Sequence, residues 1–314
     1  MSGKLVTVVI PAYNAARYLM GALDSALKQT YAAVEVVVID DGSTDETPRL
    51  LSTVSDPRVR VVRTANQGVG AARDLGWRLG RGDFVAFLDA DDRWFPPKLA
   101  TQVEFLREHP EVGLVGCLMR YQTPAGELLG VTGVAPLSSR DREAIRQAKL
   151  MPFPISSVVV RRSVPENLGG FDEQLPRAFP GQVEDIDLVA RAARKVVVDS
   201  IPLVLGAYRV HASSASERHF TSRRVGVRFV RARLRERDAG RDLEVAAFLA
   251  SYRPNIAQRW GDVTARLYRR AGLAVAERRW LAAAGWGLVA AVIGPRYTVG
   301  RPRRQRPWER VRRG

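Results

Sequence analysis

Residues 84–92 read FVAFLDADD, in which five apolar residues are followed by three aspartates within four positions. The apolar run is typical of a strand buried on both faces of a sheet. Side chains in extended backbone alternate between faces, so Asp89 and Asp91 point the same way. Such a carboxylate pair is stable around a hard divalent cation, which prefers oxygen ligands. The stretch therefore indicates a metal site at a strand end, unless it is an Asp-rich turn that caps the helix expected after Trp94.

Similar apolar runs occur along the first two hundred residues, separated by helix-like segments. The expected strands are 5–10, 34–39, 59–62, 84–88, 112–117, 156–160 and 196–204, and the expected helices are 15–29, 46–54, 70–79, 97–108 and 184–195. Strands that alternate with helices predict βαβ units and an α/β fold with a mostly parallel, Rossmann-like sheet. The alternation fades after about residue 120, and we expect residues 124–154 to be less regular.

Acidic residues follow two of the expected strands. The second strand ends in Asp40 and Asp41, and the fourth ends in the aspartates of residues 89–92. In an open α/β sheet, ligands collect where the loops leave the carboxyl ends of the strands. These acids therefore mark the expected ligand-binding edge.

The charge of the chain is unevenly distributed. The chain has 49 Lys and Arg against 33 Asp and Glu, a net charge of +16. Residues 1–214 contain 25 basic and 25 acidic side chains, so the whole excess lies in residues 215–314. A solvated helical face, nucleic-acid binding or attachment to an anionic membrane surface could each explain it. No zinc-ligand spacing or RNA-binding signature supports the nucleic-acid alternative, so no nucleic-acid partner is expected.

We expect three parts: a catalytic α/β domain at 1–214, an α-helical extension at 215–295 and a basic, largely disordered tail at 296–314. Residues 280–294 read WLAAAGWGLVAAVIG, an apolar run with two tryptophans. Fifteen residues are fewer than the roughly 20 that span a bilayer, but they suit a surface helix or a packed hairpin. We therefore expect peripheral membrane association through the basic C-terminus.

The single cysteine and the first residues bear on the cellular compartment. Cys117 lies in the apolar run VGLVGCLM, which favours a packed core thiol and excludes an internal disulfide. The apolar run before Pro11 is too short for a signal peptide or a membrane span. We expect a cytoplasmic protein, peripheral on the inner face of the cell membrane.

Three longer segments carry a family resemblance. They are VTVVIPAYNAARYLMGALDSALKQT (6–30), VEVVVIDDGSTDET (34–47) and NQGVGAARDLGWRLGRGDFVAFLDADD (66–92). In this order and spacing, the chain resembles the nucleotide-binding half of family 2 glycosyltransferases, with weaker agreement as far as residue 214. The resemblance implies a GT-A fold and an inverting hexosyltransferase that uses Mn²⁺ or Mg²⁺. It also implies a nucleotide-diphosphate sugar donor, most simply a UDP-sugar, and a glycan or lipid-linked acceptor hydroxyl.

The resemblance also implies roles for residues near the nucleotide. Pro11, Ala12, Tyr13 and Asn14 match the segment that contacts the nucleotide, with Tyr13 available to stack on the base. Asp41 matches an acid that accepts a hydrogen bond from uracil, although residues 40–47 are also good turn and helix-start chemistry.

Further matches lie on the next helix and strand end. Arg73 matches a basic residue near the nucleotide, and its alternative is a solvated helix face. The next position is Asp74, where many members have Asn. Asp89 is assigned to nucleotide binding, and Asp91 and Asp92 to the metal.

Residues 168–175, LGGFDEQL, resemble the acceptor-side loop of the family, which assigns Gly170, Phe171 and Asp172 to the acceptor. Residues 182–195 resemble the helix that carries the catalytic acid. There Asp185 matches the general base, and Glu184 is assigned to the acceptor side. The alternative is that Glu184, Asp185 and Asp187 only suit the positive end of a helix.

The segment YRVHASSAS (208–216) resembles the part that closes over the diphosphate, so His211 is a candidate metal or phosphate ligand. A lone histidine is equally consistent with a structural role. The Q-x-x-R-W motif of processive members is absent after Asp185, which favours single addition over polysaccharide synthesis. The resemblance further implies a role in cell-surface glycan or glycolipid synthesis. Two alternatives stay open: a metal-dependent nucleotidyltransferase, and a non-catalytic basic scaffold or nucleic-acid-binding protein.

Overall fold

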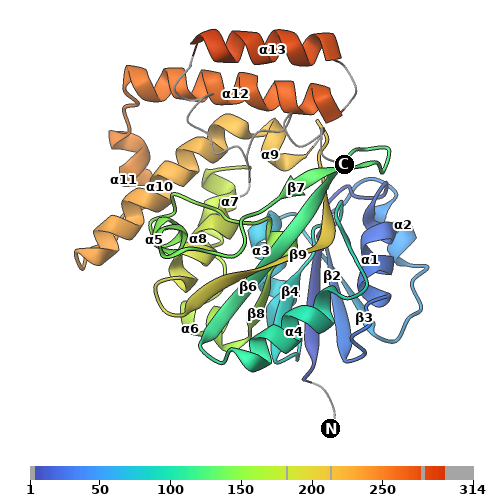
Figure 1. The fold of residues 1–314 in the computed structure, drawn as a ribbon. Coiled ribbons are helices and arrows are strands. Elements are labelled where there is room, and N and C mark those ends of the chain that lie inside the picture. Colours follow the sequence, from blue (N-terminus) through green and yellow to red (C-terminus); the bar gives the residue numbers. More distant parts are fainter. Residues whose placement is uncertain (1–3, 182, 213, 277–279, 294–314) are drawn as a thin grey trace. The chain divides into compact units, whose positions relative to one another are not determined.

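The computed structural model describes residues 4–181, 183–212, 214–276 and 280–293 (Figure 1). The chain divides into two compact units. The first comprises residues 1–119, 133–178 and 182–208, and the second comprises residues 120–132, 179–181 and 209–314. The second unit thus takes residues from three places in the sequence, which a boundary near residue 214 does not anticipate.

The described residues form a nine-stranded sheet in the order β3-β2-β1-β4-β8-β6-β9-β5, with β7 paired to β6. The strands are β1 (Val6–Ala12), β2 (Val34–Asp41), β3 (Val59–Thr64), β4 (Phe84–Phe87), β5 (Arg93–Trp94), β6 (Val112–Gln122), β7 (Leu128–Thr132), β8 (Val159–Arg161) and β9 (Val197–Arg209). Strands β1 to β4 pair in parallel, whereas β8 is antiparallel to β4 and β6, and β5 is antiparallel to β9. The α/β class expected from the sequence is confirmed, and the complete sheet is mixed.

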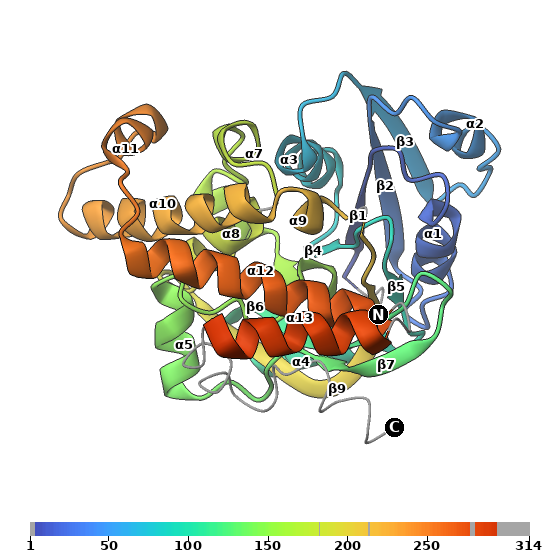
Figure 2. The ribbon, with the colours of Figure 1, turned by 90° about the horizontal axis from the view of Figure 1, so that it is seen from above.

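The helices of the described residues are α1 (Leu19–Leu27), α2 (Thr47–Leu51), α3 (Val69–Leu79), α4 (Lys98–Glu108), α5 (Ser139–Arg146), α6 (Ser163–Leu168), α7 (Gln174–Ala178), α8 (Glu184–Ala192), α9 (Ala215–Arg218), α10 (Phe220–Asp238), α11 (Val245–Ser251), α12 (Ile256–Ala276) and α13 (Trp280–Ile293). Those of the first unit cover both faces of its sheet (Figures 1 and 2). In β1, Val8 and Ile10 pack in one cluster with α1 and α4, and Val9 packs in the other with α3 and α8. Near-continuous burial of β1 follows from this three-layer arrangement.

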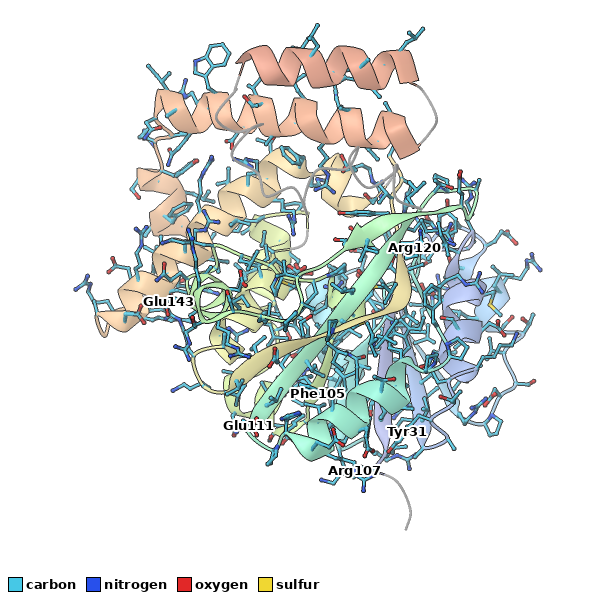
Figure 3. All side chains as sticks on the ribbon, viewed as in Figure 1. Tyr31, Phe105, Arg107, Glu111, Arg120 and Glu143 are labelled. Atoms are coloured by element: carbon cyan, nitrogen blue, oxygen red, sulfur yellow. The ribbon has the colours of Figure 1, made fainter. Side chains whose placement is uncertain are left out.

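The rim of the first cluster is closed by aromatic side chains. Tyr31 and Phe105, labelled in Figure 3, are partly buried against it. The Tyr31 hydroxyl donates a hydrogen bond of 2.6 Å to the Lys4 carbonyl, so its polar end is satisfied while the ring packs.

Local differences from the expected elements have identifiable causes. The helix expected from residue 15 begins at Leu19, and the turn before it is tied to the next loop, where Thr47 and Asp45 accept the N–H groups of Ala15 and Ala16. The stretch 124–154 contains β7 and α5, and α5 begins with a capping box formed by Ser138 and Asp141. These elements are short, and their apolar periodicity is correspondingly weak.

Residues 215–276 and 280–293 are mainly helical, as expected, and belong to the second unit. Helices α12 and α13 lie side by side and antiparallel (Figures 1 and 2). None of the helices in the described residues is long and apolar enough to cross a membrane. The tail expected at 296–314 lies outside the described residues.

A buried lysine lies next to Trp94 of the first cluster. Lys98 at the start of α4 is fully buried, its Nζ atom lies 4.0 Å from the centre of the Trp94 ring, and it has no hydrogen-bond partner among the described residues. Burial lowers the pKa of Lys98 to about 8, although the nearby Cys117 opposes the shift. The charged form is therefore disfavoured in the folded state.

We expect Lys98→Met to raise the free energy of unfolding at pH 7 by up to about 3 kcal/mol, the equivalent of the fall in pKa from 10.5 to about 8. Between these two values the unfolded state binds more protons, so the stability of the parent rises with pH. The gain should therefore be complete below pH 8 and vanish above about pH 10.

Urea unfolding of the parent and the variant at pH 7 and above pH 10 measures this gain in the free energy of unfolding. Lys28→Met is the control, because Lys28 is 72% exposed and makes only a surface pair with Asp24. A pH-independent gain, or none, would show that Lys98 is not a strained charge.

Candidate active site

The acidic strand ends meet at one edge of the sheet. Strands β1, β2 and β4 are parallel neighbours, so the loops that follow Ala12, Asp41 and Phe87 leave the sheet on the same side. Apart from His211, the sequence-predicted nucleotide and metal residues lie at the ends of these strands, in the loops that follow them and in the first half of α3. The topology thus brings together segments that are about 75 residues apart.

Hydrogen bonds join the loops that follow β1 and β2. The Asn14 Oδ1 atom accepts the N–H of Thr44 at 2.8 Å, and the Asn14 N–H donates to Ser43 Oγ at 3.0 Å. Asn14 has a φ of 48°, a left-handed conformation that Asn tolerates better than most residues. This interlock leaves the Tyr13 side chain 50% exposed beside buried Pro11 and Ala12.

Asp41 is buried and organises the start of α3. Its two carboxylate oxygens accept the backbone N–H groups of Gln67 and Gly68, each at 2.8 Å. The turn expected at residues 40–47 is also present, because Asp40 accepts the Ser43 N–H and Asp45 accepts the Thr47 N–H. Hydrogen bonding to uracil through Asp41 would use the remaining lone pairs of this carboxylate and stays a prediction.

A cavity of about 220 Å³ adjoins Asp41. Its lining residues are Asp41, Thr64, Gln67, Ala71, Ala72, Asp74, Leu75, Arg78 and Glu173. The volume is below the roughly 300–1,000 Å³ of most small-molecule sites. The cavity is therefore smaller than most sites that enclose a whole small-molecule ligand.

Arg73 joins the strand-end acids to the helix acids. Its guanidinium is fully buried and bonds to Asp89 Oδ1 at 2.5 Å and to Glu184 Oε1 at 2.6 Å. The solvated-face alternative for Arg73 is therefore wrong. Arg73 Nε and Glu184 Oε2 are buried and have no hydrogen-bond partner among the described residues. Such atoms in a native site call for a bound water or ligand.

One buried cation thus faces several carboxylates. Burial raises the pKa of Glu184 to about 7, an effect that Arg73 opposes and that the charge of Asp185 strengthens. Burial also raises the pKa of Asp89, again against Arg73 and with the help of Asp91 and Asp185. Perturbed carboxyl groups clustered in this way are characteristic of functional sites.

The residues assigned to a metal lie in different places. Asp91 and Asp92 form the turn after β4, and α4 begins after Pro97 with no side-chain cap, so the helix-capping alternative is wrong. His211 lies in the second unit, between β9 and α9. No group of three His, Cys, Asp or Glu that could hold a metal occurs in the described ranges. Metal binding therefore stays a prediction.

The three acids in the first turn of α8 have different partners. Glu184 pairs with Arg73, and Asp187 pairs with Arg191 at 2.7 Å. Asp185 is 7% exposed, its Oδ1 accepts the N–H of Ile186 at 2.7 Å, and it makes no ion pair among the described residues. All three also suit the positive end of the helix.

The loop at residues 168–171, before Asp172, is held between α3 and α8. Arg191 of α8 donates to the carbonyls of Leu168 and Gly170, at 2.9 and 2.8 Å. From α3, Arg78 donates to the Gly169 carbonyl at 3.2 Å, and Asp74 accepts the Phe171 N–H at 3.0 Å. Each of four successive residues is therefore fixed by a charged side chain.

Gly170 is required by the close approach of Asp74. It has a φ of +82°, and a Cβ atom there would lie 1.9 Å from Asp74 Oδ1. Phe171 packs edge to face on Phe87, with ring centres 5.2 Å apart, directly before the acidic turn. Asp74, which stands where the resemblance would place Asn, thus binds the loop at residues 168–171.

Sequence reasoning missed this loop clamp and one strand-end contact. Asp74 with Arg78 and Asp187 with Arg191 are acid–base pairs four residues apart, a spacing that the sequence displays. The missed contact is Ser156 Oγ, which accepts the Asp89 N–H at 3.1 Å. No local pattern signals that pair, because the residues are 67 positions apart.

Comparison with known proteins identifies the family of the chain. The family model described as glycosyl transferase family 2 matches residues 7–168, which is more than half of the chain. The protein belongs to this family.

Two curated relatives show the range of the family. The succinoglycan biosynthesis protein ExoO of Rhizobium meliloti is 45% identical over 100 residues, which cover 32% of this chain and 29% of that protein. The Escherichia coli UDP-Glc:alpha-D-GlcNAc-diphosphoundecaprenol beta-1,3-glucosyltransferase WfaP is 34% identical over 104 residues, covering 33% and 41%. The chain spans less than half the length of these relatives.

Solved structures share the fold over most of the chain. S. aureus TarS 1-349 in complex with UDP-GlcNAc has a TM-score of 0.57 at 18% identity and covers 95% of this chain and 92% of that one. Mannosyltransferase PcManGT from Pyrobaculum calidifontis, in complex with GDP-Man and Mn²⁺, has a TM-score of 0.55 at 24% identity and covers 94% and 87%. The GT-A fold expected from the sequence is confirmed, and at these identities the likeness concerns the fold alone.

Proposed function

We propose that the protein is an inverting glycosyltransferase that moves one sugar from a nucleotide-diphosphate donor, a UDP-sugar, to an acceptor hydroxyl. The observation that carries the proposal is the buried Arg73, which holds the acid of the β4 end and the first acid of α8 in one cluster. A donor site and a candidate base thereby share one rigid arrangement. Family membership favours glycosyl transfer over the nucleotidyltransferase and scaffold alternatives.

We assign Asp185 as the general base of the transfer reaction. Transfer requires a carboxylate that takes the proton of the acceptor hydroxyl as the oxygen attacks the anomeric carbon. Glu184 and Asp187 are each paired with an arginine, whereas Asp185 makes no ion pair among the described residues. The clamped loop at residues 168–171 would hold the acceptor against this acid.

A divalent cation fits the strand-end acids. Asp91 lies close enough to Asp89 to raise its pKa, while Asp89 itself is bound by Arg73. Asp91 and Asp92 would hold Mn²⁺ or Mg²⁺, which commonly uses one or two carboxylates and completes its shell with substrate phosphates and water. The cation would neutralise charge on the departing diphosphate. Mn²⁺ accompanies GDP-Man in the PcManGT complex, which shares the fold.

The acceptor is proposed to be a glycan or a lipid-linked sugar in cell-surface glycan synthesis. The name of WfaP specifies a diphosphoundecaprenol acceptor, and that of ExoO specifies succinoglycan biosynthesis. We further propose a cytoplasmic protein that associates with the inner face of the membrane, supported by the 24 basic and 8 acidic residues of 215–314.

A panel of UDP- and GDP-sugars, screened by thermal shift with Mn²⁺ or Mg²⁺, tests the proposal. A true donor at one hundred times its dissociation constant should stabilise the fold by about 2.7 kcal/mol. Metal-dependent hydrolysis of the selected donor would then establish the reaction type. Failure of every nucleotide sugar to bind or react would refute the proposed function.

We expect Asp91→Ala to abolish the metal-dependent part of donor affinity, because we assign the cation to the carboxylates of Asp91 and Asp92, whereas Asp89 is bound by Arg73. Isothermal titration of the selected donor with and without Mn²⁺ measures this. Glu104→Ala removes an equally charged but exposed acid of α4 and should leave donor binding unchanged. Parent-like affinity of Asp91→Ala in Mn²⁺ would remove Asp91 from the site.

A further inference from the structure

Exposed apolar side chains gather in the C-terminal helices. Of the thirteen large apolar side chains that are exposed in the described residues, eight lie between residues 249 and 289. On α12, Ile256 is 74% exposed, Trp260 55% and Val263 46%. On α13, Leu281 is 92% exposed and Leu288 70%. Apolar surface concentrated in this way marks an interaction surface.

The apolar residues of α12 form one row. Residues 256, 260 and 263 have the spacing i, i+4, i+7, which places them on one side of a helix. Exposed Arg259, Arg266 and Arg270 form a second row at i, i+7, i+11. At 3.6 residues per turn the two rows are centred about 65° apart, so they run alongside each other.

The positive charge of the arginine row is not paired with an acid within the part of the chain that the structure describes. None of its three arginines makes an ion pair within the described residues. The guanidinium of Arg270 lies 5.3 Å from the centre of the Trp286 ring of α13. Asp262, the acid of α12, is bound by Arg224 and Arg228 of α10. The exposed side of α12 is therefore apolar and cationic at once.

We infer that the exposed faces of α12 and α13 are the surface by which the protein docks on an anionic lipid membrane, lying in the interface without crossing it. This inference rests on the proposed membrane association and names the surface that makes it. A row of Ile, Trp and Val beside a row of Arg is the pattern of an interfacial helix. Tryptophan suits the boundary between headgroups and acyl chains.

Other occupants fit the surface less well. A second copy of the chain would bring a second arginine row towards the first. A nucleic acid would satisfy the arginines but would leave Ile256 and Val263 without an apolar partner. Anionic lipid satisfies both rows, and arginines near such a surface add attraction that salt weakens.

The test is sedimentation of the full chain with vesicles of equal parts phosphatidylcholine and phosphatidylglycerol. We expect Ile256→Ser/Trp260→Ser to lower the partition coefficient by roughly tenfold or more, because two apolar side chains no longer leave water. Leu203→Ser, at a 50% exposed position of β9, should not change it. Arg259→Gln/Arg266→Gln/Arg270→Gln should weaken binding to these vesicles and leave the weaker binding to pure phosphatidylcholine unchanged.

The outcomes separate the inference from the proposals on which it rests. Parent-like sedimentation of the serine variant and of the glutamine variant would overturn the inference. If removal of residues 296–314 then abolished binding, the membrane contact would belong to the tail. No sedimentation of the parent would refute membrane association altogether. A parent that is dimeric by light scattering and a monomeric Ile256→Ser/Trp260→Ser would make the face a self-association interface. We expect every variant to bind the donor as the parent does, measured by thermal shift. Unchanged donor binding would show that the fold is intact and that the transferase proposal does not depend on the membrane result.

Discussion

Asp185→Asn should lower transfer by a factor of about 10² to 10⁴ while leaving donor affinity unchanged, because a general base is needed only when the acceptor hydroxyl loses its proton. The amide has nearly the same shape and still suits the first turn of α8. It can also accept the N–H of Ile186, as the carboxylate does. Fold stability should therefore change little.

Hydrolysis of the donor by water provides a readout that does not require the natural acceptor, since water also needs a base. Donor affinity is measured in parallel by isothermal titration. Retained turnover in Asp185→Asn would mean that Asp185 only caps the helix and that Glu184 or Asp187 is the candidate. Joint loss of turnover and donor binding would place Asp185 in the donor or metal site.

Arg73→Met should lower the free energy of unfolding by about 3–5 kcal/mol at pH 8, because it removes the cation that Asp89 and Glu184 share in a buried cluster. The loss should be smaller at pH 5. Glu184 has a pKa of about 7 in the folded protein, above its unfolded value, so it is protonated there and leaves less uncompensated charge. Loss of Arg73 removes the effect that opposes this rise in pKa, so the stability of the variant should fall between pH 5 and pH 8.

Urea unfolding at pH 5 and pH 8 measures both the loss and its pH dependence. Arg107→Met is the control: its side chain is 61% exposed, and its pair with the equally exposed Glu104 should contribute about 1 kcal/mol or less. A loss below about 1 kcal/mol for Arg73→Met at pH 8 would show that the acids do not depend on this cation.

The sequence by itself determined the elements whose signals are local. The apolar runs at β1, β2 and β4 and the helix patterns between them specify buried strands joined by crossovers, because a strand or helix pattern depends on near neighbours. The acids after β2 and β4 follow from the same pattern, since parallel strands end at one edge. The sequence pattern did not predict β7 and α5, because the stretch that contains them is only weakly periodic.

Only the tertiary structure decided which of these polar groups are bound together. Arg73 and Glu184 are 111 positions apart, and Asp74 and Phe171 are 97 positions apart. A motif places Arg73 on a helix but cannot show which side of that helix is buried or which acid faces it, because both depend on how α3 and α8 pack on the sheet. Glu184 is paired through that packing, and Asp187 is paired with Arg191 one turn further along α8. Asp185, alike in sequence, is therefore the acid without an ion pair in the described part of the chain.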